Sequence, residues 1–428
     1  MAAIAFALVA VTRLHLAITM LAPLALFTNI FGAWLASGAT SVGGLLRDFA
    51  TLALLGAWVA GRQRAGRPAE LTRGRLGLLA FGALVVLLAL ASEDRGIALV
   101  GTRNYILYAG LLFAVSDLLR DEAPRRRAVQ ALLGGYLVMT LLAVAEVATN
   151  GAALSAIGFD LSYSGAGASR QEAADTFLGR RRATAAVGNA LDFGWLCMFA
   201  FLLAVAWRPT SRAERWLHRA TLAGAAVGLV LSLTRSAWLG AAGGLVAMAV
   251  LAGDGRARRA LLAAAAAAGL ALLAFPEAAA VERLLNRDIS SQRTTSGRLE
   301  IYEYAAGFAA RNPLGVGIGV QGSANTDIVD PRRFTLDSYY LQMVGDGGVP
   351  LAAAYLAAMA MLLLELRRRA RRGTGIDRSL ATAGVGLVAA VLLANVTSGS
   401  MDSRIISIQL WTLLGLAMPL PAGQPGGG

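Results

Sequence analysis

The chain has 428 residues, of which 57% are hydrophobic and 15% charged, and its mean hydropathy is +0.60. A soluble domain is about 45–50% apolar and about 25% charged, so the composition excludes an ordinary soluble globular protein. The formal net charge is +13, and all 39 basic positions are arginine. These arginines lie between apolar runs, which argues against nucleic acid and favours anionic lipid headgroups or a lipid-linked phosphate as partners. Two explanations account for the absence of lysine. A GC-rich genome encodes arginine wherever a positive residue is needed, or arginine is used because its planar guanidinium group fits phosphate better than a lysine ammonium does.

Apolar runs of roughly 17–25 residues, long enough to cross a bilayer, recur from one end of the chain to the other. We therefore predict an all-α, polytopic membrane protein with about twelve transmembrane helices, forming one integral membrane domain over residues 1–428. The predicted spans are 14–36, 46–61, 76–92, 101–118, 128–148, 190–207, 218–234, 236–252, 259–276, 338–365, 379–396 and 405–420.

Arginine bias in the short loops predicts the orientation, because cytoplasmic loops carry an excess of basic residues. Five arginine-rich loops alternate with the others and are placed in the cytoplasm: 61–75, 119–127, 208–219, 253–259 and 365–378. The two longest loops, about 149–189 and 277–337, then face the periplasmic side. That side also receives four single arginines: Arg95, Arg103, Arg235 and Arg404.

The second long loop has predicted structure of its own. Residues 294–296 are Thr-Thr-Ser, which are N-cap candidates, so we predict a helix over 297–310 that ends at Asn312-Pro313. A glycine-rich run over 315–319 follows and suits a close backbone approach. It is not a dinucleotide fingerprint, because no strand–helix unit surrounds it.

Arg298 and Arg235 are the first candidates for binding an anion. Arg298 lies in the first turn of the predicted loop helix, where free N–H groups and the helix dipole already favour a phosphate. The alternative is an ion pair with Glu300 or Glu303. Arg235 lies between two apolar spans, where an unpaired charge costs roughly 2.5–3.5 kcal/mol on insertion scales. It is either functional or a side chain that snorkels to the interface.

Further candidates flank these two. The run 180–182 contains three arginines, which bind a diphosphate or form a solvated charge cluster. Asp337 precedes a predicted span and is a candidate general base, a helix N-cap or both. Glu146, Arg47, Asp48 and Arg103 are charges in or beside apolar runs and are expected to support packing.

Other kinds of site are limited by composition. The two histidines, His15 and His218, lie away from the long periplasmic loops, so a histidine-based mechanism is not expected there. Cys197 is the only cysteine, which excludes a disulfide or a thiolate metal site within the chain. The first thirty residues lack a basic n-region and a clean cleavage site, and are read as a membrane segment.

Several of these residues belong to an ordered set of motifs. The motifs are TRSAWLG at 234–240, SGR at 296–298, NPLGVGIG at 312–319 and DSYYLQMVGDGGVP at 337–350, with weaker similarity in GTRNYILYAG at 101–110 and RRATAAVGNALDFGWL at 181–196. Their order and spacing, and the long outer loop between two late spans, resemble the O-antigen ligase/polymerase superfamily.

The resemblance implies a GT-C-like glycosyltransferase of the bacterial inner membrane, active on the periplasmic side. Such an enzyme transfers a glycan from undecaprenyl diphosphate to an acceptor hydroxyl and needs no metal or other cofactor. Arg235 and Arg298 match the positions expected to hold the donor diphosphate, and Asp337 is the expected base, with Glu300 or Glu303 as alternatives. The expected contacts to diphosphate or glycan are Arg181, Arg182, Glu300, Tyr302, Glu303, Tyr339 and Tyr340.

One departure from the pattern separates two members of the superfamily. Ligases that transfer the finished glycan to lipid A-core typically have a histidine where Asp337 stands, whereas polymerases often have an aspartate. The sequence therefore favours a polymerase of O-antigen, capsule or exopolysaccharide. The alternatives are a ligase or protein O-oligosaccharyltransferase and, more remotely, a transporter or flippase, although no paired broken helices are evident. Membrane lipids are expected partners, and a chain-length co-polymerase is left open.

Overall fold

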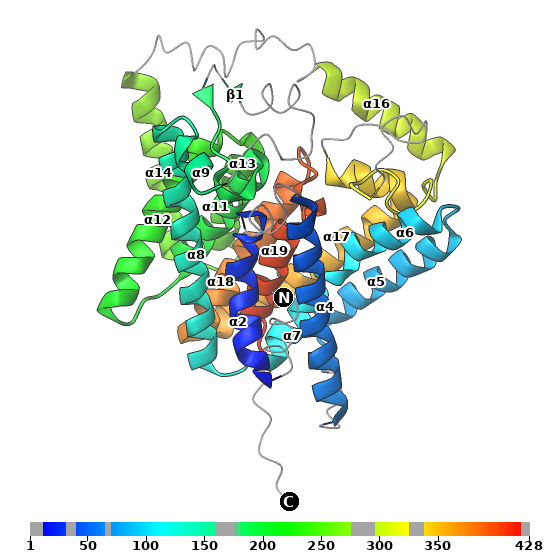
Figure 1. Cartoon of the computed structure of the whole chain (residues 1–428), viewed down its shortest axis with the longest axis horizontal. Helices are drawn as coiled ribbons and strands as arrows, with labels where there is room; N and C mark the ends of the chain where they lie inside the picture. The colour runs from blue at the N-terminus through cyan, green and yellow to red at the C-terminus, as the bar shows by residue number, and fades with distance from the viewer. Residues whose placement is uncertain are drawn as a thin grey trace, which may run out of the picture.

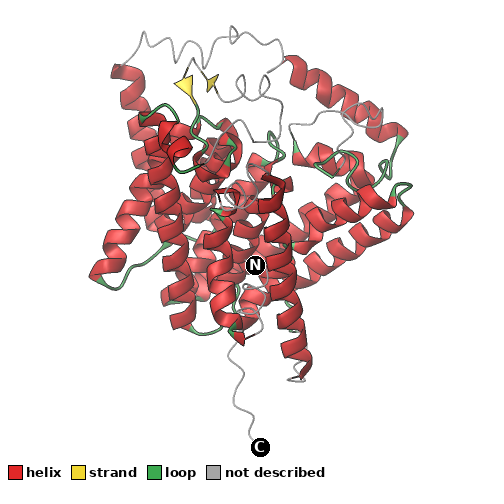
Figure 2. Ribbon diagram, viewed as in Figure 1, coloured by secondary structure: helices red, strands yellow, loops and turns green. Residues whose placement is uncertain are grey.

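The computed structural model describes residues 12–30, 40–64, 70–158, 176–177, 180–274, 296–324 and 338–420. These parts of the chain are helical apart from loops and one antiparallel pair of two-residue strands, β1 (Thr176–Phe177) and β2 (Arg180–Arg181). The prediction of an all-α protein is confirmed, as Figure 1 and Figure 2 show.

Each predicted span corresponds to a helix or to a run of consecutive helices. The first half contains α2 (Leu14–Ala25), α4 (Thr40–Arg64), α5 (Arg73–Ala91), α6 (Arg95–Thr102), the π-helix η1 (Arg103–Leu107), α7 (Gly110–Leu118), α8 (Glu122–Ala148) and α9 (Ala152–Ala156). The second half contains η3 (Ala185–Val187), α11 (Ala190–Ala206), α12 (Arg212–Ser232), α13 (Arg235–Val250), α14 (Gly255–Ala274), α16 (Ser296–Arg311), α17 (Tyr339–Arg372), α18 (Gly375–Ala394), η4 (Ser400–Asp402) and α19 (Arg404–Ala417).

Length and composition identify the membrane-spanning helices. Six segments of the described chain are long and apolar enough to cross a membrane: Gly44–Arg64, Arg73–Ala91, Arg95–Leu118, Glu122–Ala148, Tyr339–Arg372 and Gly375–Ala394. Four shorter apolar helices, α2, α11, α13 and α19, accompany them. The other two predicted spans are α12 and α14, whose first turns carry arginines. The protein is therefore a polytopic helical membrane protein.

The arginine-rich loops that were predicted to share one side lie at one end of the helix bundle. Contacts of these loops with one another and with the adjacent helix ends include Arg62–Asp117 (2.7 Å), Arg126–Glu214 (3.2 Å), Arg125–Asp377 (2.5 Å) and Arg371 Nε to the Leu251 carbonyl (2.8 Å). The opposite end carries α9, β1 and α16, the last of which lies across that end of the bundle (Figure 1). This alternation agrees with the connectivity that the sequence predicts.

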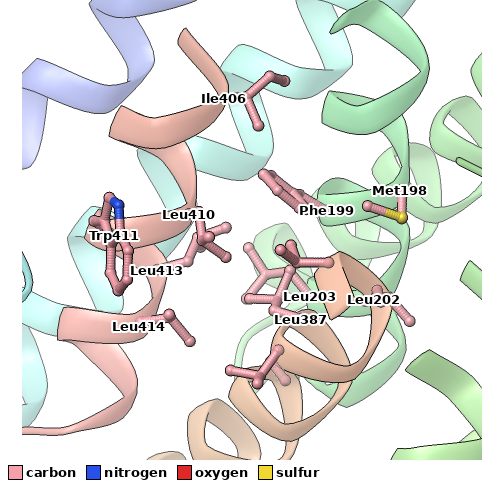
Figure 3. Close-up of a cluster of buried hydrophobic side chains, with 14 of the residues drawn as sticks. Met198, Phe199, Leu202, Leu203, Leu387, Ile406, Leu410, Trp411, Leu413 and Leu414 are labelled. Atoms are coloured by element: carbon pink, nitrogen blue, oxygen red, sulfur yellow. The ribbon is translucent and has the colours of Figure 1, made fainter. Parts of the chain in front are cut away.

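The centre of the bundle is formed by α11, α18 and α19. Side chains from all three interdigitate, among them Phe199, Leu387 and Leu410, each at most 1% exposed (Figure 3). Neighbouring α13 packs on α18 so closely that a Cβ at Gly244 would lie 2.9 Å from the carbonyl oxygen of Gly386. Small residues allow such an approach between membrane helices, where dispersion rather than hydrophobic burial drives packing.

Helix α17 is broken immediately after Asp346. Gly347 and Gly348 leave helical geometry, and Gly348 has φ +72°, which an L residue rarely adopts. Pro350 has no N–H, so it cannot donate the i→i−4 hydrogen bond to the Asp346 carbonyl. The break therefore leaves backbone carbonyls without their helical partners in a predominantly apolar protein.

The glycine-rich loop after α16 supplies the missing donors. Val316 N–H donates to the Gly345 carbonyl (2.9 Å) and Gly317 N–H to the Asp346 carbonyl (3.1 Å). On its other side the loop touches α6, where a Cβ at Gly101 would lie 2.6 Å from the Cα of Gly319. The two glycine-containing motifs, NPLGVGIG and DGGVP, are thus complementary parts of one structure.

Substitution of Gly348 by alanine is expected to prevent normal folding. The new Cβ would overlap the carbonyl of Pro313. The alanine would also have to keep the positive φ of Gly348, which is unfavourable for an L residue. Gly253→Ala is the matched control, because Gly253 has φ +68° with nothing within 4 Å of its Cβ position. The control should lose about 1–2 kcal/mol from backbone strain alone, whereas Gly348→Ala should lose clearly more. Thermal unfolding of the detergent-purified variants measures both, and equal losses would contradict the proposed interlock.

Candidate functional site

A group of charged and amide side chains meets at the end of the bundle that also carries α16. We call it the polar cluster; it consists of Arg47, Asp48, Arg103, Asn104, Asp192, Asp402 and Arg404. Its members come from α4, the π-helix η1, α11, η4 and the start of α19. Charges gathered at the end of membrane helices are costly unless they are paired or reached by a ligand, so such a group marks a functional region.

Asn104 joins three separate parts of the chain. Its side-chain nitrogen donates to Asp402 (2.9 Å) and to Ser323 Oγ (3.2 Å), and its oxygen accepts from Arg103 Nη2 (2.9 Å). Ser323 N–H also donates to the second carboxylate oxygen of Asp402 (2.5 Å). The loop after α16 is therefore attached to η4 through the Asp402 carboxylate and to η1 through the Asn104 amide.

The π-helical turn explains how consecutive residues reach different partners. In η1, Arg103 Nη1 pairs with Asp48 of α4 (2.9 Å), Asn104 binds Asp402, and Tyr105 OH donates to Asp346 of α17 (2.8 Å). A π-bulge widens the helix locally and is frequent at functional sites. Here it directs three adjacent side chains towards α4, η4 and α17.

Asp48 is the main acceptor of the cluster. It accepts hydrogen bonds from Arg103 and from Tyr108 OH, and it lies 3.8 Å from Arg404 Nε. Arg47 interacts electrostatically with Asp192 and Arg404, and Asp192 also accepts a hydrogen bond from Ser403 Oγ (2.6 Å). Three arginines thus face three aspartates, so the cluster has balanced formal charge.

Part of the cluster is accessible. The side chains of Arg103 and Arg404 are 24% and 29% exposed, whereas that of Asp48 is 9% exposed. Two guanidinium groups that are anchored on a buried carboxylate can still present N–H groups to a bound anion or to sugar hydroxyls. The cluster is suited to binding a polar ligand at the membrane surface.

Asp346 has a different role, because it is buried and satisfied by the protein. One carboxylate oxygen accepts from Gln321 N–H (2.7 Å) and the other from Tyr105 OH (2.8 Å). Together with its own carbonyl, which binds Gly317 N–H, this side chain fixes the glycine-rich loop on the break of α17. Asp346 therefore positions the loop that carries Ser323 to the polar cluster.

The junction between α12 and α13 forms a second basic element at the same end. Leu233 adopts φ +49°, which turns the chain sharply before α13 begins. Arg182 stabilises the turn, since its Nε donates to the Ser232 carbonyl and its Nη2 to Thr234 Oγ1, both at 2.9 Å. Arg235 is exposed in the first turn of α13, and it makes no ion pair with another described residue.

The structure distinguishes among the predicted site residues. Arg182 stabilises the turn through its hydrogen bonds, while Arg235 is exposed and makes no ion pair with another described residue. Arg298 and Glu300 lie in the first two turns of α16, which confirms the predicted loop helix, but their side chains are outside the described atoms. The side chain of Arg181 in β2 is likewise outside them, and Asp337 falls outside the described residues altogether.

The predicted tyrosines separate into two groups. Tyr302 and Glu303 of α16 are exposed, and Tyr302 OH donates to the Val396 carbonyl (2.8 Å), which attaches α16 to the turn between α18 and η4. Tyr339 is buried, with its ring 5.7 Å from that of Tyr355, and Tyr340 OH donates to the Leu392 carbonyl (2.6 Å). The structure therefore places Tyr339 and Tyr340 in helix packing contacts.

Asn104, Asp192, Asp346 and Asp402 were not singled out in the sequence. The sequence did contain an indication that Asp402 and Arg404 are functional, because charges that flank the start of an apolar span are unusual. Asp48 and Arg103 were expected only to support packing, yet they pair with each other at the centre of the cluster. No group of three His, Cys, Asp or Glu side chains suited to a metal ion occurs among the described residues.

Comparison with known proteins adds to this geometry. A family model described as O-Antigen ligase matches residues 220–356, which include Arg235, the loop helix α16 and the break in α17. An O-antigen polymerase of Salmonella muenchen is 24% identical over 283 residues, covering 62% of this chain and 67% of that protein. Both comparisons agree with the resemblance of the motifs: this polytopic membrane protein is similar to the O-Antigen ligase family over residues 220–356 and to an O-antigen polymerase over 283 residues.

Proposed function

We propose that this protein polymerises oligosaccharide repeat units carried on undecaprenyl diphosphate, at the periplasmic face of the inner membrane. The observation that carries the proposal is the exposed Arg235 at the first turn of α13, at the same end of the bundle as α16 and the polar cluster. A helix N-terminus with an arginine that has no described partner is suited to a diphosphate.

The reaction is a displacement at the anomeric carbon of the donor sugar. The acceptor hydroxyl oxygen forms the new bond to this carbon while the bond to the diphosphate oxygen breaks, and the diphosphate leaves with the electron pair. Arg235 and Arg298 stabilise the developing negative charge, and Asp337 accepts the hydroxyl proton. In this mechanism guanidinium groups supply the charge that a metal ion supplies elsewhere.

Positioning supports the choice of Arg235 and Arg298. Arg182 and Thr234 fix the turn before Arg235, and Tyr302, four residues after Arg298, is attached to the Val396 carbonyl. A fixed backbone lowers the entropy that is lost when a ligand binds. The polar cluster, with its amide and carboxylate groups, is the proposed binding surface for sugar hydroxyls.

A ligase is the second candidate, because the matching family model is described as O-Antigen ligase. The aspartate at position 337, where ligases typically have a histidine, favours the polymerase. The prediction of a chain-length co-polymerase as partner accompanies the polymerase reading and stays a prediction.

Arg235→Ala and Arg298→Ala are each expected to lower polymer formation by about 100-fold or more at unchanged protein level, since each removes a charge-assisted contact to the leaving group. Arg212→Ala is the matched control, because Arg212 is also exposed and also begins a helix, at the opposite end of α12. Gel profiles of polysaccharide from a complemented deletion strain measure the effect. Full-length polymer from both test variants would contradict the donor site.

Asp337→Asn should reduce the rate of transfer by about 10²–10⁴-fold, because the amide cannot accept the hydroxyl proton. Donor binding should change little, and Asp337→Glu should recover part of the rate. The assay follows elongation of purified lipid-linked repeat units by membranes that contain each variant. If Asp337 acts only as a helix cap, Asp337→Asn should retain activity, since asparagine is an equally good N-cap.

Deletion of the gene separates polymerase from ligase. Loss of a polymerase should leave acceptors that carry a single repeat unit, whereas loss of a ligase should leave long polymer on the lipid carrier and none on the acceptor. Mass spectrometry of the carrier-linked and acceptor-linked glycans distinguishes these outcomes. Long carrier-linked polymer in the deletion strain would overturn the polymerase assignment in favour of the ligase.

A further inference from the structure

A basic pocket lies at the end of the bundle opposite to α16, far from the candidate transferase site. It has a volume of about 260 Å³ and lies between the end of α11 and the N-terminal halves of α12 and α14. Its lining residues are Val205, Pro209, Arg215, His218, Arg219, Leu222, Arg256 and Ala260. None of these described lining residues is acidic.

Helix α12 places its basic lining residues on one face. Arg215, His218, Arg219 and Leu222 follow the i, i+3, i+4, i+7 spacing of one side of an α-helix. The His218 ring is held by a hydrogen bond between Nε2 and the Ala204 carbonyl (2.9 Å), so Nε2 carries the proton. Arg215 and Arg219 are exposed, and neither makes an ion pair with a described residue.

The nearest carboxylates are already engaged by other groups. Glu214 accepts from Thr210 N–H (2.6 Å) and from Gln130 (2.6 Å), and it pairs with Arg126 on α8. Asp254 caps α14 by accepting from the N–H groups of Arg256 and Ala257. The positive charge of the pocket is therefore not neutralised by its immediate acidic neighbours.

The pocket is amphipathic and lies where a membrane surface is expected. Val205, Leu222 and Ala260 line it with apolar atoms next to the arginines. Trp216, beside Arg215 on α12, is 68% exposed, and exposed tryptophans are enriched at membrane–water interfaces. Basic pockets between membrane helices on the cytoplasmic side bind anionic headgroups.

We propose that this pocket binds the phosphate of an anionic phospholipid headgroup, with Arg215, Arg219 and Arg256 as its ligands. The phosphodiester lies among the guanidinium groups, and the adjoining glycerol and acyl carbons contact Leu222 and Ala260. Arg256 Nη1 already donates to the Trp207 carbonyl (2.9 Å), which fixes the position of this lining side chain. The lipid would tie α11, α12 and α14 together at the end remote from the transferase site.

The test uses purified full-length protein, stripped of lipid in detergent, and phosphatidylglycerol in mixed micelles as the probe. The midpoint of thermal unfolding should rise saturably with phosphatidylglycerol and not with phosphatidylcholine. The double variant Arg215→Gln/Arg219→Gln should weaken this apparent affinity by about tenfold or more. Ala260→Met, which fills the apolar side without a change of charge, should weaken it as well.

The matched control is Arg127→Gln/Arg258→Gln, which removes two exposed arginines at the same end that do not line the pocket. It should bind phosphatidylglycerol like the wild type. Equal weakening in the control would overturn the proposal in favour of diffuse attraction to a basic surface. An equal shift with inorganic phosphate alone would overturn the lipid assignment, because the apolar side would then contribute nothing.

Discussion

Backbone groups inside a membrane protein must find hydrogen-bond partners within the protein, and this constraint explains the arrangement around α17. Pro350 and the two preceding glycines break the helix, and the carbonyls of Gly345 and Asp346 are then satisfied by Val316 and Gly317. The partners come from a loop that follows α16 in the chain. The loop must therefore dock on the break before α17 can be stable, which couples the outer segment to the membrane domain.

The same coupling positions the polar cluster. Asp346 holds Gln321 through its side chain, and two residues later Ser323 donates to Asp402. Asp402 in turn binds Asn104, whose neighbour Arg103 pairs with Asp48. A series of short contacts thus links α17, η4, η1 and α4, so a displacement of the loop would disturb the charges beneath it. The loop after α16 and the polar cluster are therefore parts of one hydrogen-bonded structure.

Much of the fold could be predicted because its signals are local. Apolar runs of sufficient length located the spans, arginine bias grouped the loops by side, and Ser296 together with Asn312-Pro313 marked the ends of α16. The glycines at 315–319 correctly indicated a close backbone approach, which occurs at Gly101. Two glycines followed closely by Pro350 are a local pattern that indicates the break in α17. The sequence does not indicate which loop packs against that break.

The site was less accessible to prediction because its contacts join distant residues. Asn104 and Asp402 are 298 positions apart, and the π-helical turn that presents Asn104 has no simple sequence pattern. Tyr339 and Tyr340 appeared suited to a sugar ligand, since they follow a candidate base. Their rings instead pack with Tyr355 of the same helix. Aromatic residues near a helix start serve packing or binding equally well, and only the neighbouring helices decide which.

Arg182 and Arg235 show that residue type alone does not predict whether an arginine is engaged by the protein or exposed. Both are arginines near the α12–α13 junction, and both were candidates for the donor diphosphate. Arg182 is occupied by the Ser232 carbonyl and the Thr234 hydroxyl, whereas Arg235 is exposed one residue after Thr234. The first arginine uses its hydrogen-bonding capacity to build the turn, and the turn leaves the second one free. Exposure and the absence of an ion pair with another described residue therefore distinguish Arg235 from Arg182, whose backbone contacts hold the turn that precedes Arg235.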